Sequence, residues 1–553
     1  MRRVIFAAAL AAALIIAAPA SAQRSADTKV QLLAINDFHG NLQPPSGSSG
    51  RIPGPGGTSI DAGGVEYLAT HMNQLREQGG RTITVGAGDL IGASPLISGL
   101  FHDEPTIEAM NALGLDVTGV GNHEFDEGVA ELLRMQNGGC HPDDGCQDGD
   151  PFSGAFFQYL AANVFYAGTD RTILPPYEIK GAGHNTKIAF IGLTLEGTPL
   201  IVTPSAVAGL EFRDEIVTVN ALVKQLKEAG VRAIVVLVHE GGQQTAPFAG
   251  GFMNINACEN FTGPIKDIVL GLDKEVDVVV SAHTHQPYVC NFGGIVTTSA
   301  SSFGRLITDI DLRIDGTTKD VESVSAQNRI VTRNVPKDPA ETAIVDKYNA
   351  ISAPISNRVV GSASADLTRA ANAAGESALG DVIADAQLAS TSPTDFGGAV
   401  VAFMNPGGIR ADIAAGEVTY GELFTVQPFS NTLTVKTMTG DMIYRLLEQQ
   451  FRTAPAPDVV LQVSSGFTYS YDRSAAAGSR VSNVAINGTP VDKAASYRVA
   501  MNSFLATGGD GFSVFNEGTD QLGGEIDLDA LVNYFMKNSP IAPGPQNRIT
   551  RTG

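Results

Sequence analysis

Residues 30–40 read VQLLAINDFHG, an almost uninterrupted apolar run that ends in an aspartate and a histidine two positions apart. Apolar runs without polar alternation are typical of strands buried on both faces of a sheet. The same character recurs in five later runs: Thr82–Val85, Val117–Val120, Ile188–Leu193, Ala233–Val238 and Asp277–Val280. Amphipathic stretches such as Val217–Ala229 separate several of them, and this alternation predicts an α/β layered domain.

The chain beyond residue 335 also mixes helices and strands. An apolar stripe at helical spacing marks Asp338–Ile351, with Pro339 at its start and Pro354 beyond its end, and we expect this helix to connect two domains. Later residues predict helices around Leu379–Leu388 and over Met442–Gln450, and strands over Ala399–Met404, Thr432–Thr437, Val459–Ser464 and Tyr497–Met501. The expected division is a first domain over 23–335, a linker helix over 336–358 and a second domain over 359–553.

The first residues have the pattern of a secretory signal peptide. Arg2 and Arg3 precede 15 apolar residues, Val4–Ala18, and an A-x-A pattern ends at Ala22, after which we expect cleavage. A membrane anchor is the less favoured alternative, because a spanning helix needs about 20 apolar residues. The chain ends in Arg551-Thr552-Gly553 without an apolar tail, so we expect a periplasmic or secreted protein with no stable membrane insertion.

The formal charge of −21 restricts the partners of this protein. So strong a negative field repels nucleic-acid polymers, and none is expected as a partner. A small phosphorylated substrate would bind only where the site supplies local positive charge. Composition makes no prediction of the oligomeric state.

Four cysteines in an exported chain favour two disulfides. We predict Cys140–Cys146, which flank a polar loop, and Cys258–Cys290, one of three possible pairings. Free buried thiols are less expected in an oxidising compartment. A cysteine metal site is disfavoured, since neither pair has CxxC spacing.

Acidic, amide and imidazole side chains follow several of the predicted strands. They form Asp37-Phe38-His39, Gly88-Asp89, Asn122-His123-Glu124, His239-Glu240 and His283-Thr284-His285. Side chains two apart on a strand point the same way, so Asp37 and His39 can hold one ion. Each motif alone is more often structural, but together they supply two carboxylates, four imidazoles and an amide, too many for one tetrahedral ion. We predict two divalent ions, and mixed N/O ligation suits Zn, Mn, Fe or Co.

These five blocks, in this order, resemble the calcineurin-like metallophosphoesterases, and in particular the 5′-nucleotidase and UDP-sugar hydrolase family. The resemblance implies an α/β sandwich followed by an α+β nucleotide-binding domain. It also implies a ligand set: Asp37, His39 and His285 for the first metal, Asp89 as the bridge, and Asn122, His239 and His283 for the second. His285 is the least certain ligand, because its position varies within the family.

The resemblance implies that His123 and Asp126 are the catalytic pair. A metal-activated water attacks phosphorus in line, His123 stabilises the transition state or protonates the departing oxygen, and Asp126 orients the ring. A further ligand role for His123 is disfavoured, since Asn122 occupies that place in the family pattern.

The second half resembles the substrate-binding part of the same family. Asn405 and Arg410 belong to an N-x-G-G-x-R block that suits phosphate, Phe429 and Phe504 to loops that sandwich a base, and Asp510 to a ribose-binding turn. Taken alone, Phe429 and Phe504 would more often be core residues. Because the substrate must then reach both domains, we expect catalysis to need domain closure.

One departure concerns the phosphate. Family members often carry an arginine just before the first helix of the second domain, where this chain reads Ala370–Ser377 and Arg369 is out of register. We therefore expect a looser phosphate grip, and the substrate class stays open. A 5′-nucleotidase is the leading reading, with a 2′,3′-cyclic phosphodiesterase with 3′-nucleotidase activity or a UDP-sugar hydrolase as alternatives. An exported nucleotide-binding protein without activity and an enzyme for non-nucleotide esters are the further readings.

Overall fold

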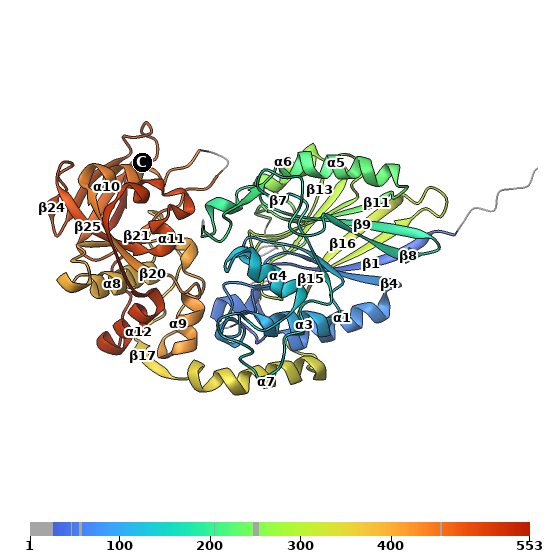
Figure 1. The fold of residues 1–553 in the computed structure, drawn as a ribbon, viewed down its shortest axis with the longest axis horizontal. Helices are drawn as coiled ribbons and strands as arrows, with labels where there is room; N and C mark the ends of the chain where they lie inside the picture. The colour runs from blue at the N-terminus through green and yellow to red at the C-terminus, as the bar shows by residue number, and fades with distance from the viewer. Residues whose placement is uncertain (1–25, 46, 55–57, 204, 247–253, 454–455) are drawn as a thin grey trace, which may run out of the picture.

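The computed structural model describes residues 26–45, 47–54, 58–203, 205–246, 254–453 and 456–553. The predicted signal peptide and its cleavage point after Ala22 lie outside these residues. Two α/β bodies stand side by side, and the long helix α7 (Pro339–Ser356) runs along the edge of the first body and leads into the second (Figure 1). None of the helices in the described ranges is both long and apolar enough to span a bilayer.

The first body contains two six-stranded sheets. One has the order β16-β15-β1-β4-β5-β6, with β1 (Thr28–Ile35), β4 (Arg81–Ala87), β5 (Val117–Gly119), β6 (Gln158–Leu160), β15 (Leu306–Ile314) and β16 (Val321–Ile330). The other has the order β13-β14-β12-β11-β9-β8, with β8 (Tyr177–Gly183), β9 (Thr186–Thr194), β11 (Ala233–His239), β12 (Val278–Ser281), β13 (Pro287–Phe292) and β14 (Ile295–Ala300). All six strands predicted in this half are confirmed.

The two sheets pack face to face, and helices cover their outer faces (Figure 1). Leu32 of β1 joins Val85, Phe190 and Leu237 in the core between the sheets, whereas the neighbouring Leu33 joins the core under the helices. The first sheet is covered by α1 (Val65–Gln78), α3 (Glu104–Leu113) and α4 (Val129–Asn137), and the second by α5 (Glu215–Glu228) and α6 (Pro264–Gly271). Both faces of the central strands, such as β1 and β11, are therefore buried, which explains the continuous apolar runs.

Helix α7 begins where the sequence predicts but ends later. The Asp338 carboxylate caps it by accepting the N–H groups of Ala340 and Glu341, at 2.9 and 3.2 Å. The prediction that Pro354 lies beyond the helix is wrong, because the helix runs through it to Ser356. A proline in the last turn removes only one intrahelical hydrogen bond, and the N–H of Asn357 still reaches the carbonyl of Ala353 at 2.9 Å.

The second body holds a five-stranded and a four-stranded sheet. The first has the order β21-β18-β25-β20-β26, with β18 (Val401–Met404), β20 (Thr432–Thr439), β21 (Gln462–Val463), β25 (Ser496–Asn502) and β26 (Thr519–Ile526). The second has the order β24-β23-β22-β27, with β22 (Phe467–Tyr471), β23 (Val481–Ile486), β24 (Thr489–Pro490) and β27 (Ile549–Arg551). Helices α8 (Ala378–Thr391), α10 (Gly440–Glu448) and α12 (Asp527–Asn538) pack around them.

One strand of this half is shorter than predicted. The sequence predicts a strand over Val459–Ser464, but only Gln462–Val463 pairs in the sheet. The residues just before it bond to Gln450 instead of to a neighbouring strand. The carbonyl of Gln450 accepts the N–H of Val459, and its Oε1 accepts the N–H of Leu461. Both predicted disulfides, Cys140–Cys146 and Cys258–Cys290, are formed.

Candidate functional site

The loops that follow β1, β4, β5, β11 and β12 converge at one end of the sandwich. Two groups of predicted ligands form there, each with its donor atoms within 4.8 Å of one another: Asp37, His39 and His285, and Asp89, His239 and His283. The carboxylate of Asp89 lies between the groups, with Oδ2 3.6 Å from Nε2 of His39 and 2.9 Å from Nε2 of His239. This is the position that a bridging carboxylate requires.

The backbone at this site is held in an uncommon conformation. Five of the predicted ligands have a left-handed φ: Asp37 48°, His39 48°, Asp89 49°, His283 70° and His285 55°. Non-glycine residues rarely adopt such angles, and clusters of them mark functional sites whose surroundings impose the strain. Here the N–H of His283 donates to Asp37 Oδ1 at 3.0 Å, and the N–H of His123 donates to Asp89 Oδ1 at 2.9 Å. The loops therefore hold one another.

Two imidazole rings are oriented by backbone carbonyls. Nδ1 of His39 lies 2.8 Å from the carbonyl of Gly92, and Nδ1 of His239 lies 2.8 Å from that of Ala87. A ring that donates its Nδ1 proton outward presents Nε2 with a free lone pair, as metal-ligating histidines do. The Nε2 atoms of His39 and His285 are 3.1 Å apart, a usual separation for two donors on one ion.

The donor set fits divalent cations. Asn122 Oδ1 is buried and has no hydrogen-bond partner among the described residues, and such an acceptor costs about 1–3 kcal/mol unless a cation approaches it. Burial lowers the pKa of His39 and of His285 well below the usual range, so both rings are neutral, the form that binds metals. Burial likewise lowers the pKa of His283 to about 4.

The raised pKa of His239 shows that this site strongly favours positive charge. Burial alone would lower its pKa, but the charge of Asp89, the hydrogen bond to it and the charge of Asp37 outweigh burial and raise the pKa to about 10. Two carboxylates with 0 and 2 % exposure thus stabilise any cation placed between them.

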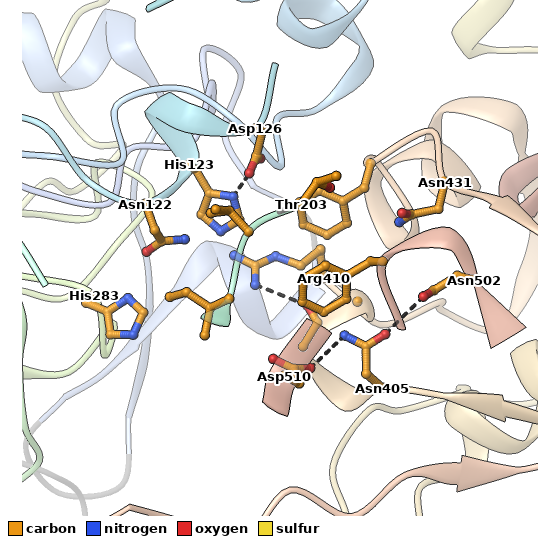
Figure 2. A pocket seen from close by; sticks show the side chains of 16 residues that line it. Asn122, His123, Asp126, Thr203, His283, Asn405, Arg410, Asn431, Asn502 and Asp510 are labelled. Carbon is orange, nitrogen blue, oxygen red and sulfur yellow. Dashed lines mark hydrogen bonds and ion pairs between the residues drawn. The ribbon is translucent and has the colours of Figure 1, made fainter. Parts of the chain in front are cut away.

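The predicted catalytic pair borders this centre. His123 Nδ1 is 2.7 Å from Asp126 Oδ2, and the dashed contact is visible in Figure 2. Burial opposes protonation of His123, but the charges of Asp126 and Asp89 and the hydrogen bond to Asp126 raise its pKa overall. The pair is therefore arranged to keep a proton on the ring, although His123 also lies within 4.8 Å of donor atoms of His39 and Asp89.

Sequence reasoning missed a buried carboxylate that joins two of these loops. Glu124 accepts the N–H groups of Asp89 and Leu90, at 2.9 and 2.8 Å, and that of Gly121. It lies inside the Asn122-His123-Glu124 motif, but only the fold shows that its side chain turns away from the metals and into the loop backbone.

A cavity of about 270 Å³ opens between the two bodies beside the catalytic pair. Residues of both bodies line it (Figure 2): Asn122, His123, Asp126, Ile201, Val202, Thr203 and His283 of the first, and Asn405, Gly407, Gly408, Arg410, Phe429, Asn431, Asn502, Phe504 and Asp510 of the second. All five predicted substrate residues are among them. Ile201–Thr203 and Asn431 were not predicted, since neither stretch carries a motif.

Hydrogen bonds fix the polar floor of this cavity. Asn502 donates to Asn405 Oδ1 at 3.0 Å, and Asn405 donates to Asp510 Oδ2 at 2.9 Å. The ring of Phe504 lies on Gly509, where an added Cβ would come within 2.6 Å of ring carbons. A side chain at 509 would displace that ring, so the glycine is required for its position.

Arg369 lies at the site although its register in the sequence is displaced. Its Nη1 approaches the carbonyl of Ile409 at 3.4 Å, and its charge, after burial, lowers the pKa of Arg410. It also lines a second cavity of about 260 Å³, together with His285 and Arg305. Two arginines therefore face the metal centre from the second body.

Comparisons with known proteins agree with this geometry. Residues 30–287 match the calcineurin-like phosphoesterase family, and residues 359–517 match the 5′-nucleotidase C-terminal domain. Endonuclease YhcR of Bacillus subtilis is 34% identical over 94% of this chain, which spans 41% of that protein. Cell wall protein Lmo0130 of Listeria monocytogenes is 32% identical over 93% of this chain and 68% of its own length. A 5′-nucleotidase precursor from Thermus thermophilus superimposes with a TM-score of 0.78 at 25% identity, covering 95% of this chain and 99% of the other.

Proposed function

Because this chain belongs to the family of metal-dependent phosphoester hydrolases that join a calcineurin-like phosphoesterase domain to a 5′-nucleotidase C-terminal domain, we propose that it releases phosphate from nucleotides. One observation carries the proposal: a single cavity is lined by the pair His123–Asp126, by Arg410, and by the aromatic rings of Phe429 and Phe504. A nucleoside phosphate has groups that match these side chains, a phosphate for the arginine and a base for the rings.

The proposed roles follow from the positions of the side chains. One divalent ion would be held by Asp37, His39 and His285, and a second by Asn122, His239 and His283. Asp89 would contact both ions. Zn or Mn would supply an activated water and neutralise charge on the phosphoryl group.

Side chains of the protein would bind the substrate and supply the proton for the leaving group. Arg410 and Arg369 bind phosphoryl oxygens, His123 donates a proton to the leaving oxygen, and Asp126 holds the ring. In the second body, Phe429 and Phe504 clamp the base, and Asp510 accepts hydrogen bonds from the ribose.

Phosphodiester hydrolysis is a second candidate. The cavity lined by His285, Arg305 and Arg369 leaves room beside the metal centre for a further group on phosphorus. A cyclic nucleotide, a UDP-sugar or a nucleic-acid end would carry such a group, although the charge of −21 opposes the last of these.

A substrate panel tests the proposal. The purified protein is stripped of metal, reloaded with Mn or Zn, and assayed for phosphate or alcohol release from AMP, 2′,3′-cyclic AMP, UDP-glucose and phenyl phosphate. We expect metal-dependent release with AMP turned over fastest, and almost none from Asp89→Asn, which loses the shared charge. Faster turnover of cyclic AMP or UDP-glucose would replace the leading candidate by the second, and no turnover of any nucleotide with metals bound would reject both.

We also propose that the protein is exported and loses residues 1–22, and that its two domains meet at a linker over residues 336–358. Mass determination of the mature protein after expression in a Gram-negative host checks the cleavage, which a retained Met1 or a different first residue would contradict. Limited proteolysis checks the linker, since cuts are expected near the ends of α7 rather than within either body.

A further inference from the structure

His102 lies between two carboxylates on the surface beside the catalytic pair. It occupies the turn between α2 (Leu96–Gly99) and α3. Its Nδ1 is 2.8 Å from Oε2 of Glu127, and its Nε2 is 2.8 Å from Oδ2 of Asp144. An ionised carboxylate only accepts hydrogen bonds, so both ring nitrogens must donate and the ring is an imidazolium. This contact joins the loop that carries Glu127 to the small loop closed by the Cys140–Cys146 disulfide.

The disulfide loop covers the His102 ring with a second imidazole. The rings of His102 and His141 are stacked, with centroids 3.7 Å apart and planes inclined by 6°. The lone pairs of the two rings therefore lie in parallel planes and do not converge on one point, so these histidines are not arranged to share a metal ion. His141 Nδ1 also accepts the N–H of Asp144 at 3.2 Å. The cluster is a cation held by two anions, with a second imidazole stacked on it.

Two neighbouring residues connect this cluster to the catalytic pair. Glu127, which His102 holds, directly follows Asp126 in the chain. Asp103, the next residue after His102, accepts the N–H of Gly92 through Oδ2 at 2.9 Å. Gly92 lies against the pair, because an added Cβ there would be 2.6 Å from His123 Cβ and 3.0 Å from Asp126 Oδ2.

The backbone at this turn is strained in the same sense as at the metal loops. His102 and Asp103 both have a left-handed φ, 51° and 62°. Consecutive non-glycine residues in this region persist only where their contacts hold them. Asp103 has such contacts in Gly92 and Ser98, and His102 has them in its two carboxylates.

We propose that His102 is a positioning residue for the His123–Asp126 pair: as a cation it ties Glu127 to Asp144 of the disulfide loop, and so fixes the backbone that presents Asp126 to His123. Loss of its proton removes one hydrogen bond and leaves two carboxylates facing each other without a cation. The 126–128 turn then relaxes, and the proton donor is presented less often in its reactive geometry. No contact with substrate or metal is assigned to His102.

The proposal sets a direction for the pH dependence of turnover. The hydrogen bond that His102 donates to Glu127 is the main cause that raises the pKa of His102 to about 9. Burial opposes it, and the charges of Glu127 and Glu131 and the bond to Asp144 add to it. The titratable groups that face the ring are Glu127, Glu131, Asp144 and His141. Because the pKa of the folded ring is about 9, His102 stays a cation at neutral pH and loses its proton as the pH rises through about 9. Turnover should fall around that same pH.

The test compares kcat against pH for the metal-loaded enzyme and three variants. It uses whichever ester the wild type turns over fastest, so it rests on the proposed roles of His123 and Asp126 but not on the nucleotide preference. His102→Gln removes the cation, and Glu127→Gln removes its main partner without touching the ring. His184→Gln is the matched control, since His184 has a similar φ of 48° but lies on an exposed turn between β8 and β9. Metal content, KM and Tm are measured for each protein.

Each outcome decides the matter. We expect His102→Gln to lower kcat about tenfold at pH 7.5, as loss of an oriented acid would, with KM and metal content unchanged and the fall near pH 9 absent. Glu127→Gln should move that fall down by roughly one pH unit, and His184→Gln should match the wild type. A fall that stays in place in Glu127→Gln, a kcat of His102→Gln within twofold of the wild type, or loss of bound metal in His102→Gln would each overturn the proposal.

Discussion

The ring of His123 stacks on the ring of Phe429, with centroids 5.6 Å apart and planes inclined by 14°. One residue belongs to the loop of the first body that carries the His123–Asp126 pair, and the other to the second body. The guanidinium of Arg410 lies over the same Phe429 ring at 5.8 Å. The structure thus holds the two bodies in contact at the candidate site, which is the arrangement that the expected domain closure must produce.

Replacing His123 by Gln should reduce turnover according to the leaving group. If His123 protonates the departing oxygen, a poor leaving group depends on it more than a good one, and general acids contribute roughly 10²–10⁴-fold. We expect a loss of at least 100-fold for phenyl phosphate and a much smaller loss for 4-nitrophenyl phosphate, measured as kcat. Equal losses for both esters would assign His123 to charge stabilisation or to metal binding instead.

Replacing Phe504 by Ala should weaken the binding of nucleotides only. Stacking on an aromatic ring is worth about 1–3 kcal/mol per base, so KM for AMP should rise roughly 5- to 150-fold. KM for phenyl phosphate, which has no base, should stay within twofold. Phe396→Ala, at a ring 62% exposed elsewhere in the same body, is the control. A parallel rise of KM for both substrates would mean that Phe504 supports the fold rather than the base.

Replacing Arg369 by Ala tests whether this arginine binds phosphate despite its displaced register. A charge-assisted hydrogen bond is worth about 1.5–3 kcal/mol, so kcat/KM for a dianionic monoester should fall roughly 10- to 150-fold. The loss should be smaller for a singly charged diester. Arg51→Ala is the control, because Arg51 is exposed and paired with Asp61. A change of less than twofold for the monoester would leave Arg410 as the phosphate-binding arginine of the second body.

Replacing Glu341 by Gln should stabilise the protein at neutral and alkaline pH. Glu341 is 1% exposed, its oxygens have no hydrogen-bond partner among the described residues, and burial foremost raises its pKa to about 9. A carboxyl that is protonated in the fold and ionised when unfolded stabilises fully below a pKa of about 4.5, and that stability is lost as the pH rises through about 9.

The variant removes this loss, so its Tm should equal that of the wild type near pH 4 and exceed it increasingly toward pH 9. The difference at pH 7 is on the order of 3 kcal/mol, since each unit of pKa corresponds to about 1.4 kcal/mol. Asp346→Asn, at an exposed position on the same helix, is the control for charge alone. Parallel Tm curves for Glu341→Gln and the wild type would show that Glu341 is ionised in the fold.

The sequence predicts the central strands of the first body well because both faces of each of them are buried. In β1, Val30, Leu32 and Ala34 face the second sheet while Leu33 and Ile35 face the helices, so nearly every position is apolar. The same pattern cannot show which strand belongs to which sheet. That division depends on contacts such as Ala34 with Val85, between residues far apart in the chain.

The residues of the candidate site are likewise of two kinds, those that the sequence reveals and those that only the fold reveals. Residues that must present a lone pair or a ring at the end of a strand stand out in the sequence, as Asp37 and His39 do. Residues that act through the backbone do not, because any buried acceptor could serve. Glu124 and Asp103 are of this second kind. The place of Arg369 near Arg410 also depends on the fold, because the chain between Arg369 and α8 forms a turn in which Asn372 and Glu376 are hydrogen-bonded to each other.

Helix α7 does not divide its contacts evenly between the two bodies. It packs mainly on α1, α2 and α3 of the first body, and it makes fewer contacts with α9 (Tyr420–Val426) of the second. At the end of α7, Gly421 is so close to Ser356 that an added Cβ would lie 2.1 Å from its hydroxyl oxygen. If one body swings against the other, the contacts with α1, α2 and α3 keep α7 with the first body, and the pivot is expected after Ser356. The predicted metal ligands would then stay still, and the second body would bring Phe429 and Phe504 toward them.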